Sequence, residues 1–248
     1  MARVCRGWGI ATRGVDRRSV VGMQTHPVVI VGAGPTGLML AAELALAGVE
    51  VVVLERRVDC TLAGLRAGGL LPRTLELLEQ RGVADRFVAA GQLGGALGFA
   101  QTMLDIRDLP TRHPHVLALW QTHFEQIMAA WVGELGVEVV RGVELVDFAQ
   151  GPAGVELVLS EGGPLHASYL VGCDGGRSRV RERAGIAFEG EAATTSWLIA
   201  EVELDEPPPF GHRRDALGTH AIGRRSPDEP IRVVLTERSE ERRVGKEC

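Results

Sequence analysis

The sequence predicts an α/β protein whose first part is a Rossmann-like domain built on a parallel sheet, and three neighbouring observations carry this prediction. The apolar, β-branched run Val28–Val31 is typical of a buried parallel strand. It leads directly into Gly32, Gly34 and Gly37, which fit the pattern G-x-G-x-x-G. A helical pattern and a second apolar run follow, and the second run ends on Glu55. This order indicates a unit that binds a dinucleotide.

Each residue of this unit has a physical task. Gly32 permits a tight turn, Gly34 lets the backbone approach a pyrophosphate, and Gly37 lets the next helix pack close to the strand. The start of that helix offers backbone N–H groups and the positive end of its dipole to phosphates. Glu55 stands where an acidic residue should meet a ribose hydroxyl. The alternative is a glycine-rich turn in some other parallel α/β protein.

The elements that follow the glycine pattern have clear start and stop signals. Leu38–Ala47 carries apolar residues at helical spacing, and Gly48 ends this helix. Val49–Leu54 is the second buried strand. Pro72 opens a further helix, PRTLELLEQRG, because proline is favoured at the first helical position, and Gly82 ends it.

The middle of the chain continues this alternation. Val83–Ala90 is expected to be a short helix, and Gly91–Leu109 one or two antiparallel strands at a sheet edge. Val116–Trp120 predicts a strand and Gln121–Leu135 a helix, whose apolar stripe indicates packing in the core. Val137–Val140 is a strand again, so the strand–helix–strand pattern is repeated.

The last part of the first domain predicts a small β-meander. Its strands are expected at Val143–Phe148, Val155–Leu159 and His166–Val171. A turn at Asp174–Gly176 and a short basic helix at Ser178–Ala184 follow. From Phe188 onward the composition changes, and strands at Thr194–Leu204 and Ile231–Thr236 around the proline-rich turn Pro207–Pro209 indicate the start of a second, β-rich domain.

Both ends of the chain differ from the middle. Residues 1–25 are rich in arginine and lack a periodic apolar pattern, so they are expected to be a non-native or disordered extension, with Met23 as the natural start; an organellar transit peptide is the alternative. Residues 238–248, RSEERRVGKEC, match a translated sequencing adapter codon by codon. We therefore expect an artefactual tail, a first domain over 26–187 and a truncated second domain over 188–237.

Composition excludes several classes of function. The formal net charge of −5 argues against a nucleic-acid partner. No apolar run approaches the roughly 18 residues needed to span a membrane. The four cysteines show no metal-ligand spacing and indicate reduced thiols of a cytoplasmic protein. The seven histidines lack H-E-x-x-H, and no G-x-S-x-G element is present, so neither a metal site nor a nucleophilic serine is expected.

One set of motifs then occurs in a characteristic order. The segments are GAGPTGL at 32–38, LER at 54–56, an arginine followed by PRTLELLEQRGV, QTHFEQIM at 121–128 and VGCDGGRSRVRERAGI from residue 171 to residue 186. In this order the chain resembles the FAD-dependent aromatic hydroxylases, the single-component flavoprotein monooxygenases related to p-hydroxybenzoate hydroxylase. The similarity is greatest to the branch that modifies polyketides and antibiotics, and it covers roughly residues 27–237.

The resemblance implies a Rossmann-like FAD-binding domain followed by the start of a β-rich substrate domain. It also implies roles for individual residues at the two ends of FAD. The backbone at the glycine pattern would hold the pyrophosphate, Glu55 the adenosine ribose, Arg56 would lie by the adenine, and Arg66 and Gln121 would lie on the flavin side, although many relatives carry arginine at position 121. The residues concerned are Gly32, Gly34, Pro35, Thr36, Gly37, Glu55, Arg56, Arg66, Gln121, Asp174 and Gly175.

The same resemblance implies that Asp174 and Gly175 touch FAD and help NAD(P)H to dock, with Arg177 and Arg181 as candidates for its phosphates. Arg66 could instead be a surface loop residue, and Gln121 a helix cap. The family's third motif, a Gly-Asp followed by His-Pro, is absent, which fits truncation.

The implied reaction is hydroxylation of a small aromatic or polyketide-like substrate with NAD(P)H and O2. The flavin carries the chemistry, so the sequence names no catalytic side chain. The alternatives are a flavin-dependent halogenase, an isoprenoid-chain reductase, a nicotinamide dehydrogenase or a non-catalytic FAD-binding fragment. As given, the chain is expected to be inactive by itself. Its sequence does not identify the substrate, the preferred nicotinamide cofactor or the oligomeric state.

Overall fold

The computed structural model describes residues 25–62, 66–99, 102–206, 209–216, 218–224 and 230–238. Apart from Thr25 and Arg238, the expected N-terminal extension and the expected tail lie outside these residues, as does most of the proline-rich turn. The chain divides into two compact units between Ala187 and Phe188. Each unit is described by itself.

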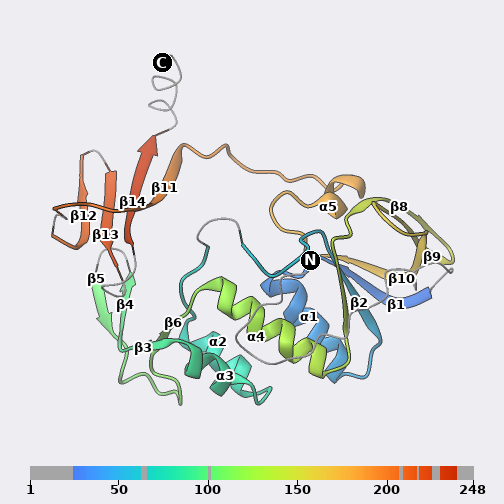
Figure 1. Ribbon diagram of the computed structural model, residues 1–248, viewed down its shortest axis with the longest axis horizontal. Helices are drawn as coiled ribbons and strands as arrows, with labels where there is room; N and C mark the ends of the chain where they lie inside the picture. Colours follow the sequence, from blue (N-terminus) through green and yellow to red (C-terminus); the bar gives the residue numbers. More distant parts are fainter. Residues whose placement is uncertain are drawn as a thin grey trace. The chain divides into compact units, whose positions relative to one another are not determined.

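A six-stranded sheet forms the centre of the first unit, with the strand order β7-β2-β1-β10-β9-β8 (Figure 1). Strands β7, β2, β1 and β10 run parallel, whereas β10, β9 and β8 are antiparallel neighbours. The strands are β1 (Thr25–Val31), β2 (Val51–Glu55), β7 (Glu138–Arg141), β8 (Leu145–Gly151), β9 (Gly154–Leu159) and β10 (Leu165–Gly172). The predicted parallel sheet with a β-meander is therefore confirmed.

Alternate residues of the central strands feed two separate hydrophobic cores. Val28 and Ile30 of β1 pack in the core that also contains side chains of the large helices. Val29 and Val31 face the opposite way, into a core formed with residues of β8, β9 and β10. Because both faces are covered, β2 is buried along its whole length. This double burial explains why the two strands appear in the sequence as continuous apolar runs.

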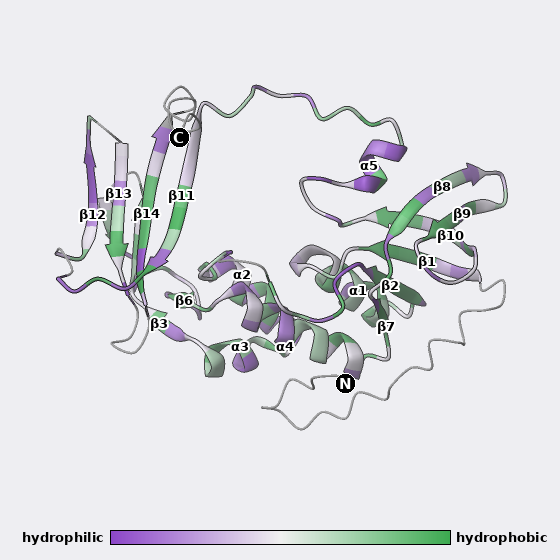
Figure 2. Cartoon of the chain, turned by 45° about the horizontal axis from the view of Figure 1, so that its top comes forward, coloured by the Kyte–Doolittle hydropathy of each residue, from purple (hydrophilic) through white to green (hydrophobic). Residues whose placement is uncertain are grey.

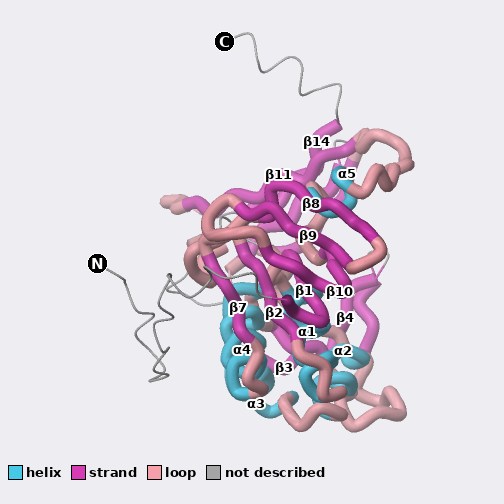
Figure 3. Tube along the Cα trace, turned by 90° about the vertical axis from the view of Figure 1, so that its right-hand side faces the viewer, coloured by secondary structure: helices cyan, strands magenta, loops and turns pink. Residues whose placement is uncertain are grey.

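Most of the helices lie together on one side of the main sheet, and the short α5 lies apart from them (Figure 3). The helices are α1 (Pro35–Leu46), α2 (Pro72–Glu79), α3 (Ala84–Ala90), α4 (Gln121–Glu134) and α5 (Arg179–Arg183). Helices α1 and α4 run side by side. Helix α1 begins at Pro35 and not at the predicted Leu38, because proline at the first helical position already has a helical φ.

The sequence predicted that the segment 91–109 forms one or two strands at the edge of a sheet, and the structure differs. The segment forms three short strands, β3 (Gln92–Gly94), β4 (Ala96–Phe99) and β5 (Thr102–Asp105). β3 pairs with β6 (Val116–Ala118), and β4 pairs with β5, in two separate two-stranded sheets. Three or four residues per strand give too short an alternation to show which partner each strand takes.

The second unit is a four-stranded antiparallel sheet with the order β11-β14-β13-β12. Its strands are β11 (Thr195–Val202), β12 (Gly211–Asp215), β13 (Gly218–Gly223) and β14 (Ile231–Arg238). The sequence predicted β11 and β14, which are neighbours in the sheet and pair along their whole length. It did not predict β12 and β13, which lie between them in the sequence. β12 is exposed throughout and largely hydrophilic (Figure 2), so it carries no apolar signal.

The contact between α1 and the loop after β1 gives a test of the fold. A Cβ added at Gly37 would lie 1.8 Å from the carbonyl oxygen of Gly32. Gly37→Ala should therefore lower the free energy of unfolding by about 3 kcal/mol, measured by denaturant titration. Gly133→Ala is the control, because its Cβ would meet no atom within 4 Å. That variant should be more stable by roughly 0.5–1 kcal/mol. Equal stability of Gly37→Ala and the wild type would contradict this packing.

Candidate dinucleotide-binding site

The candidate site lies where the carboxyl ends of the parallel strands meet the start of α1. The loop after β1 is bonded on both sides: Gly32 N–H donates to the Leu54 carbonyl, and Cys173 N–H donates to the Val31 carbonyl, each at 2.7 Å. Parallel sheets commonly bind ligands at this edge, outside the carboxyl ends of the strands. The structure therefore brings the glycine pattern, the end of β2 and the Asp174 turn into one place.

The three glycines of the pattern have different surroundings. Gly32 has a φ of +104°, and a Cβ on it would lie 2.4 Å from the Cys173 carbonyl oxygen, so only glycine fits. Gly37 is held against Gly32, as described above. A Cβ on Gly34, by contrast, would meet no atom within 4 Å. The backbone at Gly34 thus faces open space at the N-terminus of α1, as a site for a pyrophosphate requires.

Pro35 and Thr36 form the first turn of α1, directly after this open position. Pro35 has no N–H group, so Thr36 is the first residue of the helix that offers one. The Gly34 carbonyl accepts the first helical hydrogen bond from Leu38 N–H at 2.9 Å. The site therefore has backbone donors and a helix dipole directed at the open space, and these suit a dinucleotide phosphate.

Glu55 is buried at the end of β2, with 5% of its surface exposed. Its Oε2 accepts from Ala33 N–H at 2.8 Å, and its Oε1 accepts from Arg57 N–H at 2.9 Å. Burial alone would raise the pKa of this carboxyl, but the hydrogen bonds from Arg57 and Ala33 outweigh it and hold the pKa below the ordinary 4.5. Glu55 is therefore ionised and acts as a hydrogen-bond acceptor, and its expected contact with a ribose hydroxyl stays a prediction.

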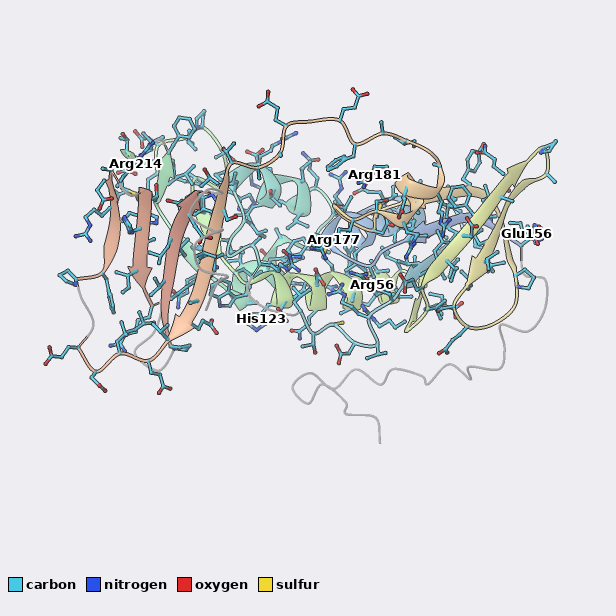
Figure 4. All side chains as sticks on the ribbon, turned by 90° about the horizontal axis from the view of Figure 1, so that it is seen from above. Arg56, His123, Glu156, Arg177, Arg181 and Arg214 are labelled. Atoms are coloured by element: carbon cyan, nitrogen blue, oxygen red, sulfur yellow. The ribbon has the colours of Figure 1, made fainter. Side chains whose placement is uncertain are left out.

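Arg57 is a residue of this site that the sequence did not single out. Its Nε and Nη2 donate to the two oxygens of Glu55 at 3.2 and 3.3 Å, and its Nη1 donates to Glu125 Oε2 at 3.0 Å. The preceding residue, Arg56, is exposed (Figure 4). Side chains alternate along an extended segment, so Glu55 and Arg57 turn inward while Arg56 turns outward. The predicted position of Arg56 beside the adenine stays a prediction.

Glu125 is the second residue that the sequence did not assign to the site. It lies on α4 with 2% of its surface exposed, on the same face as buried Met128 and Val132. A glutamate among apolar helix positions was the signal that could have revealed it, because a buried carboxylate needs a partner. Here the partners are Arg57 and Gln121, whose Nε2 donates to Glu125 Oε1 at 2.8 Å.

Gln121 links α4 to the segment that carries Arg66. Gln121 N–H donates to the Ala67 carbonyl at 2.9 Å, and its Oε1 accepts from Ala67 N–H at 3.4 Å. Arg66 itself is exposed. The structure thus brings the backbone beside Arg66 to the start of α4, and the flavin-side roles expected for Arg66 and Gln121 stay predictions.

The Asp174 carboxylate is bonded to the helix that follows it. Its Oδ2 accepts from Arg179 N–H at 2.6 Å and from Val180 N–H at 3.2 Å, and its Oδ1 accepts from the Ser178 hydroxyl. Gly175 has a φ of +84°, which permits the turn. This arrangement gives Asp174 a structural task at the start of α5. Its predicted contact with a cofactor remains untested.

Other candidate groups lie near this turn or elsewhere in the first unit. Arg181 Nη1 donates to the Gly176 carbonyl at 2.9 Å, and Arg177 is exposed (Figure 4). Burial, followed by the charge of Asp174, raises the pKa of the Cys173 thiol.

Within the described ranges, no group of three or more metal-ligating side chains could hold a metal ion. No described helix is long and apolar enough to cross a membrane.

Comparison with known proteins places the chain among flavoproteins. The family described as "FAD binding domain" matches residues 25–244. Rifampicin monooxygenase of Streptomyces venezuelae is 44% identical over 180 residues, which are 71% of this chain and 37% of that protein. Dialkyldecalin synthase of Streptomyces rugosporus is 35% identical over 214 residues, which are 85% of this chain and 46% of that protein. The solved structure of OxyS anhydrotetracycline hydroxylase from Streptomyces rimosus matches with a TM-score of 0.79 and 35% identity, covering 87% and 46%. The chain thus spans less than half the length of these relatives.

The lowered pKa of Glu55 predicts how stability depends on pH. A carboxyl whose folded-state pKa lies below 4.5 contributes stability that is complete above this value and is lost as the pH falls through the folded-state pKa. Between about pH 5 and about pH 3, the unfolding free energy of the wild type should therefore fall more steeply than that of Glu55→Gln. Denaturant titrations at several pH values measure the two slopes. Parallel curves would show that the ionised Glu55 carboxylate does not stabilise the fold.

Proposed function

The chain belongs to the FAD-binding domain family, and from this premise we propose that it is the FAD-binding part of a monooxygenase. The proposed reaction is hydroxylation of an aromatic or polyketide-like small molecule with NAD(P)H and O2. The two relatives named as a rifampicin monooxygenase and an anhydrotetracycline hydroxylase support this class of substrate. A cytoplasmic location is part of the same proposal, and it rests on reading the four cysteines, which form no C-x-x-C pair and no metal-ligand spacing, as reduced thiols.

One observation carries the proposal for FAD. The open space at Gly34 lies between two glycines that no larger residue can replace, next to the buried and ionised Glu55. In this proposal the backbone of residues 32–37 holds the pyrophosphate, and Glu55 accepts hydrogen bonds from the adenosine ribose. The remaining proposed contacts come from Arg56, Arg66, Gln121, Asp174 and Gly175.

When bound, FAD supplies the redox and oxygen chemistry of the reaction. The residues of this chain bind the cofactor and orient it: backbone N–H groups neutralise the phosphates, and Glu55 fixes the adenosine. We therefore assign no proton transfer to any described side chain. Catalytic power in such a site depends on position and on the exclusion of water.

A second function has specific support, since one relative at 35% identity is named dialkyldecalin synthase. A bond-forming cyclisation on the same FAD-binding frame is the second candidate. Halogenase and isoprenoid-chain reductase activities are further alternatives that share this frame. A non-catalytic FAD-binding fragment is the remaining alternative, because the chain covers 37% of the length of the first relative. Because the chain is expected to be inactive by itself, the test uses a longer, FAD-loaded protein that contains it. Substrate-dependent oxidation of NAD(P)H by that protein separates a monooxygenase from a synthase.

The open position at Gly34 gives the direct test. Gly34→Val should raise the dissociation constant of FAD at least about tenfold, because its side chain enters the space proposed for the pyrophosphate. Its unfolding free energy should stay within about 1 kcal/mol of the wild type, since no protein atom lies within 4 Å of the new Cβ and the main cost is a less favourable N-cap residue. Quenching of flavin fluorescence measures the binding, and denaturant titration measures the stability.

Gly133→Val is the matched control. Its Cβ also meets no atom within 4 Å, but it lies in α4, away from the glycine pattern, so FAD binding should be unchanged. A wild-type chain that does not bind FAD would overturn the proposed function. Equal FAD affinity of Gly34→Val and the wild type would overturn the proposed position of the pyrophosphate.

A further inference from the structure

A continuous chain of hydrogen bonds runs through the candidate site. It begins at Ala33 N–H in the glycine loop, passes through Glu55, Arg57 and Glu125, and reaches Gln121 on α4. Gln121 in turn exchanges two hydrogen bonds with the backbone of Ala67, the neighbour of Arg66. This series of hydrogen bonds therefore connects the end of the site assigned to the ribose with the segment assigned to the flavin side.

Arg57 makes the largest number of contacts in this series of hydrogen bonds. Its guanidinium contacts both oxygens of Glu55, one oxygen of Glu125 and the Ala33 carbonyl, the last at 3.3 Å. Such a planar, multiply bonded cation fixes the direction of its partners as well as their charge. Three segments that are distant in the sequence, the glycine loop, the end of β2 and the first turns of α4, are thus held by one side chain.

The electrostatics of the cluster indicate a task beyond stability. The side chains of Glu55 and Glu125 are only 6% and 3% exposed, and that of Arg57 is 25% exposed. Removing charges from water costs about as much as such a pair regains, so apolar residues of similar size would often serve the fold equally well. Stability alone therefore does not account for the polar cluster, and a positioning role is consistent with its contacts to three segments.

We propose that Arg57 and Glu125 are a positioning pair for the cofactor. The pair fixes the Glu55 carboxylate for the ribose and, through Gln121, holds the segment that carries Arg66 for the flavin side. This inference rests on the proposed FAD site. Neither residue needs to touch the cofactor; each acts through Glu55 or Gln121.

The test replaces both members of the pair at once, Arg57→Met with Glu125→Met. Met is similar in length to both residues, and the swap removes one positive and one negative charge, so the net charge of the cluster does not change. Glu55 keeps the backbone donors of residues 33 and 57. A single Arg57→Met variant leaves Glu125 buried beside no cation and should unfold at a lower denaturant concentration. The double variant should recover part of the lost stability, because Glu125 no longer needs a cation, while Glu55 loses the Arg57 guanidinium and keeps only its backbone donors.

The positioning role predicts that binding does not recover with stability. The double variant should bind FAD about tenfold more weakly than the wild type, or worse, because hydrogen bonds to charged groups that fix the site are lost. ADP, which has the ribose and pyrophosphate but no flavin, is the second probe. Its dissociation constant should rise less than that of FAD, since ADP does not reach the Arg66 segment.

The outcomes separate the proposals. Wild-type FAD affinity in the stable double variant would overturn the positioning role. Equal losses for ADP and FAD would overturn the connection to the Arg66 segment. A wild-type chain that binds neither ligand would overturn the proposed function, and this inference with it.

The Arg81–Glu43 pair is the matched control. It joins α1 to the residues after α2, with Arg81 Nε donating to Glu43 Oε1 at 2.6 Å, and has no contact with the glycine loop. Arg81→Met with Glu43→Met should leave the dissociation constants of FAD and ADP unchanged. A weakening equal to that of the Arg57 and Glu125 variant would show that loss of another ion pair between a loop and a helix disturbs the site equally, and would contradict the proposal.

Discussion

The close approach of α1 to the loop after β1 is the constraint on which the rest of the first unit depends. Gly32 is enclosed on two sides, by Gly37 from the helix and by the Cys173 carbonyl from the turn after β10. Neither glycine could carry a side chain without moving backbone. The contact sets where the N-terminus of α1 points, and it brings the Asp174 turn to the same edge of the sheet. The proposed site for phosphate depends on this packing, because the N-terminus of α1 begins beside the open space at Gly34.

The sequence predicted those parts of the structure that obey short-range rules. The central strands, the glycine pattern, α2, α4 and the β-meander all follow from apolar periodicity and from Pro and Gly signals, whose effects act within a few residues. Glu125 is part of the motif QTHFEQIM, but its contact with Arg57 was missed because the two residues are 68 positions apart, and no local pattern records such a contact. The strand β12 was missed because it is exposed throughout, and β13 because its short, glycine-bounded sequence GTHAIG shows no apolar alternation and its position depends on pairing with the distant β14.

The buried charges divide the site into two kinds of residue. Gly32 and Gly37 are required by geometry, so a larger residue at either position disturbs the backbone itself. Glu55, Arg57 and Glu125 are required by electrostatics, because the loss of one charge leaves another without compensation away from water. Gly34 belongs to neither kind: its surroundings tolerate a side chain. The fold therefore permits a change at Gly34 but not at Gly32 or Gly37. A substitution at Gly34 can thus test binding separately from folding.

The relatives also limit what this site explains. A rifampicin monooxygenase, an anhydrotetracycline hydroxylase and a dialkyldecalin synthase are all at least 35% identical to this chain over most of its length. Proteins with different named reactions therefore share this fold, so the fold alone does not select between those reactions. Selection must come from residues that face the substrate. The role that we propose for Arg57 and Glu125 concerns only how the cofactor is held, so it would apply to any of these reactions.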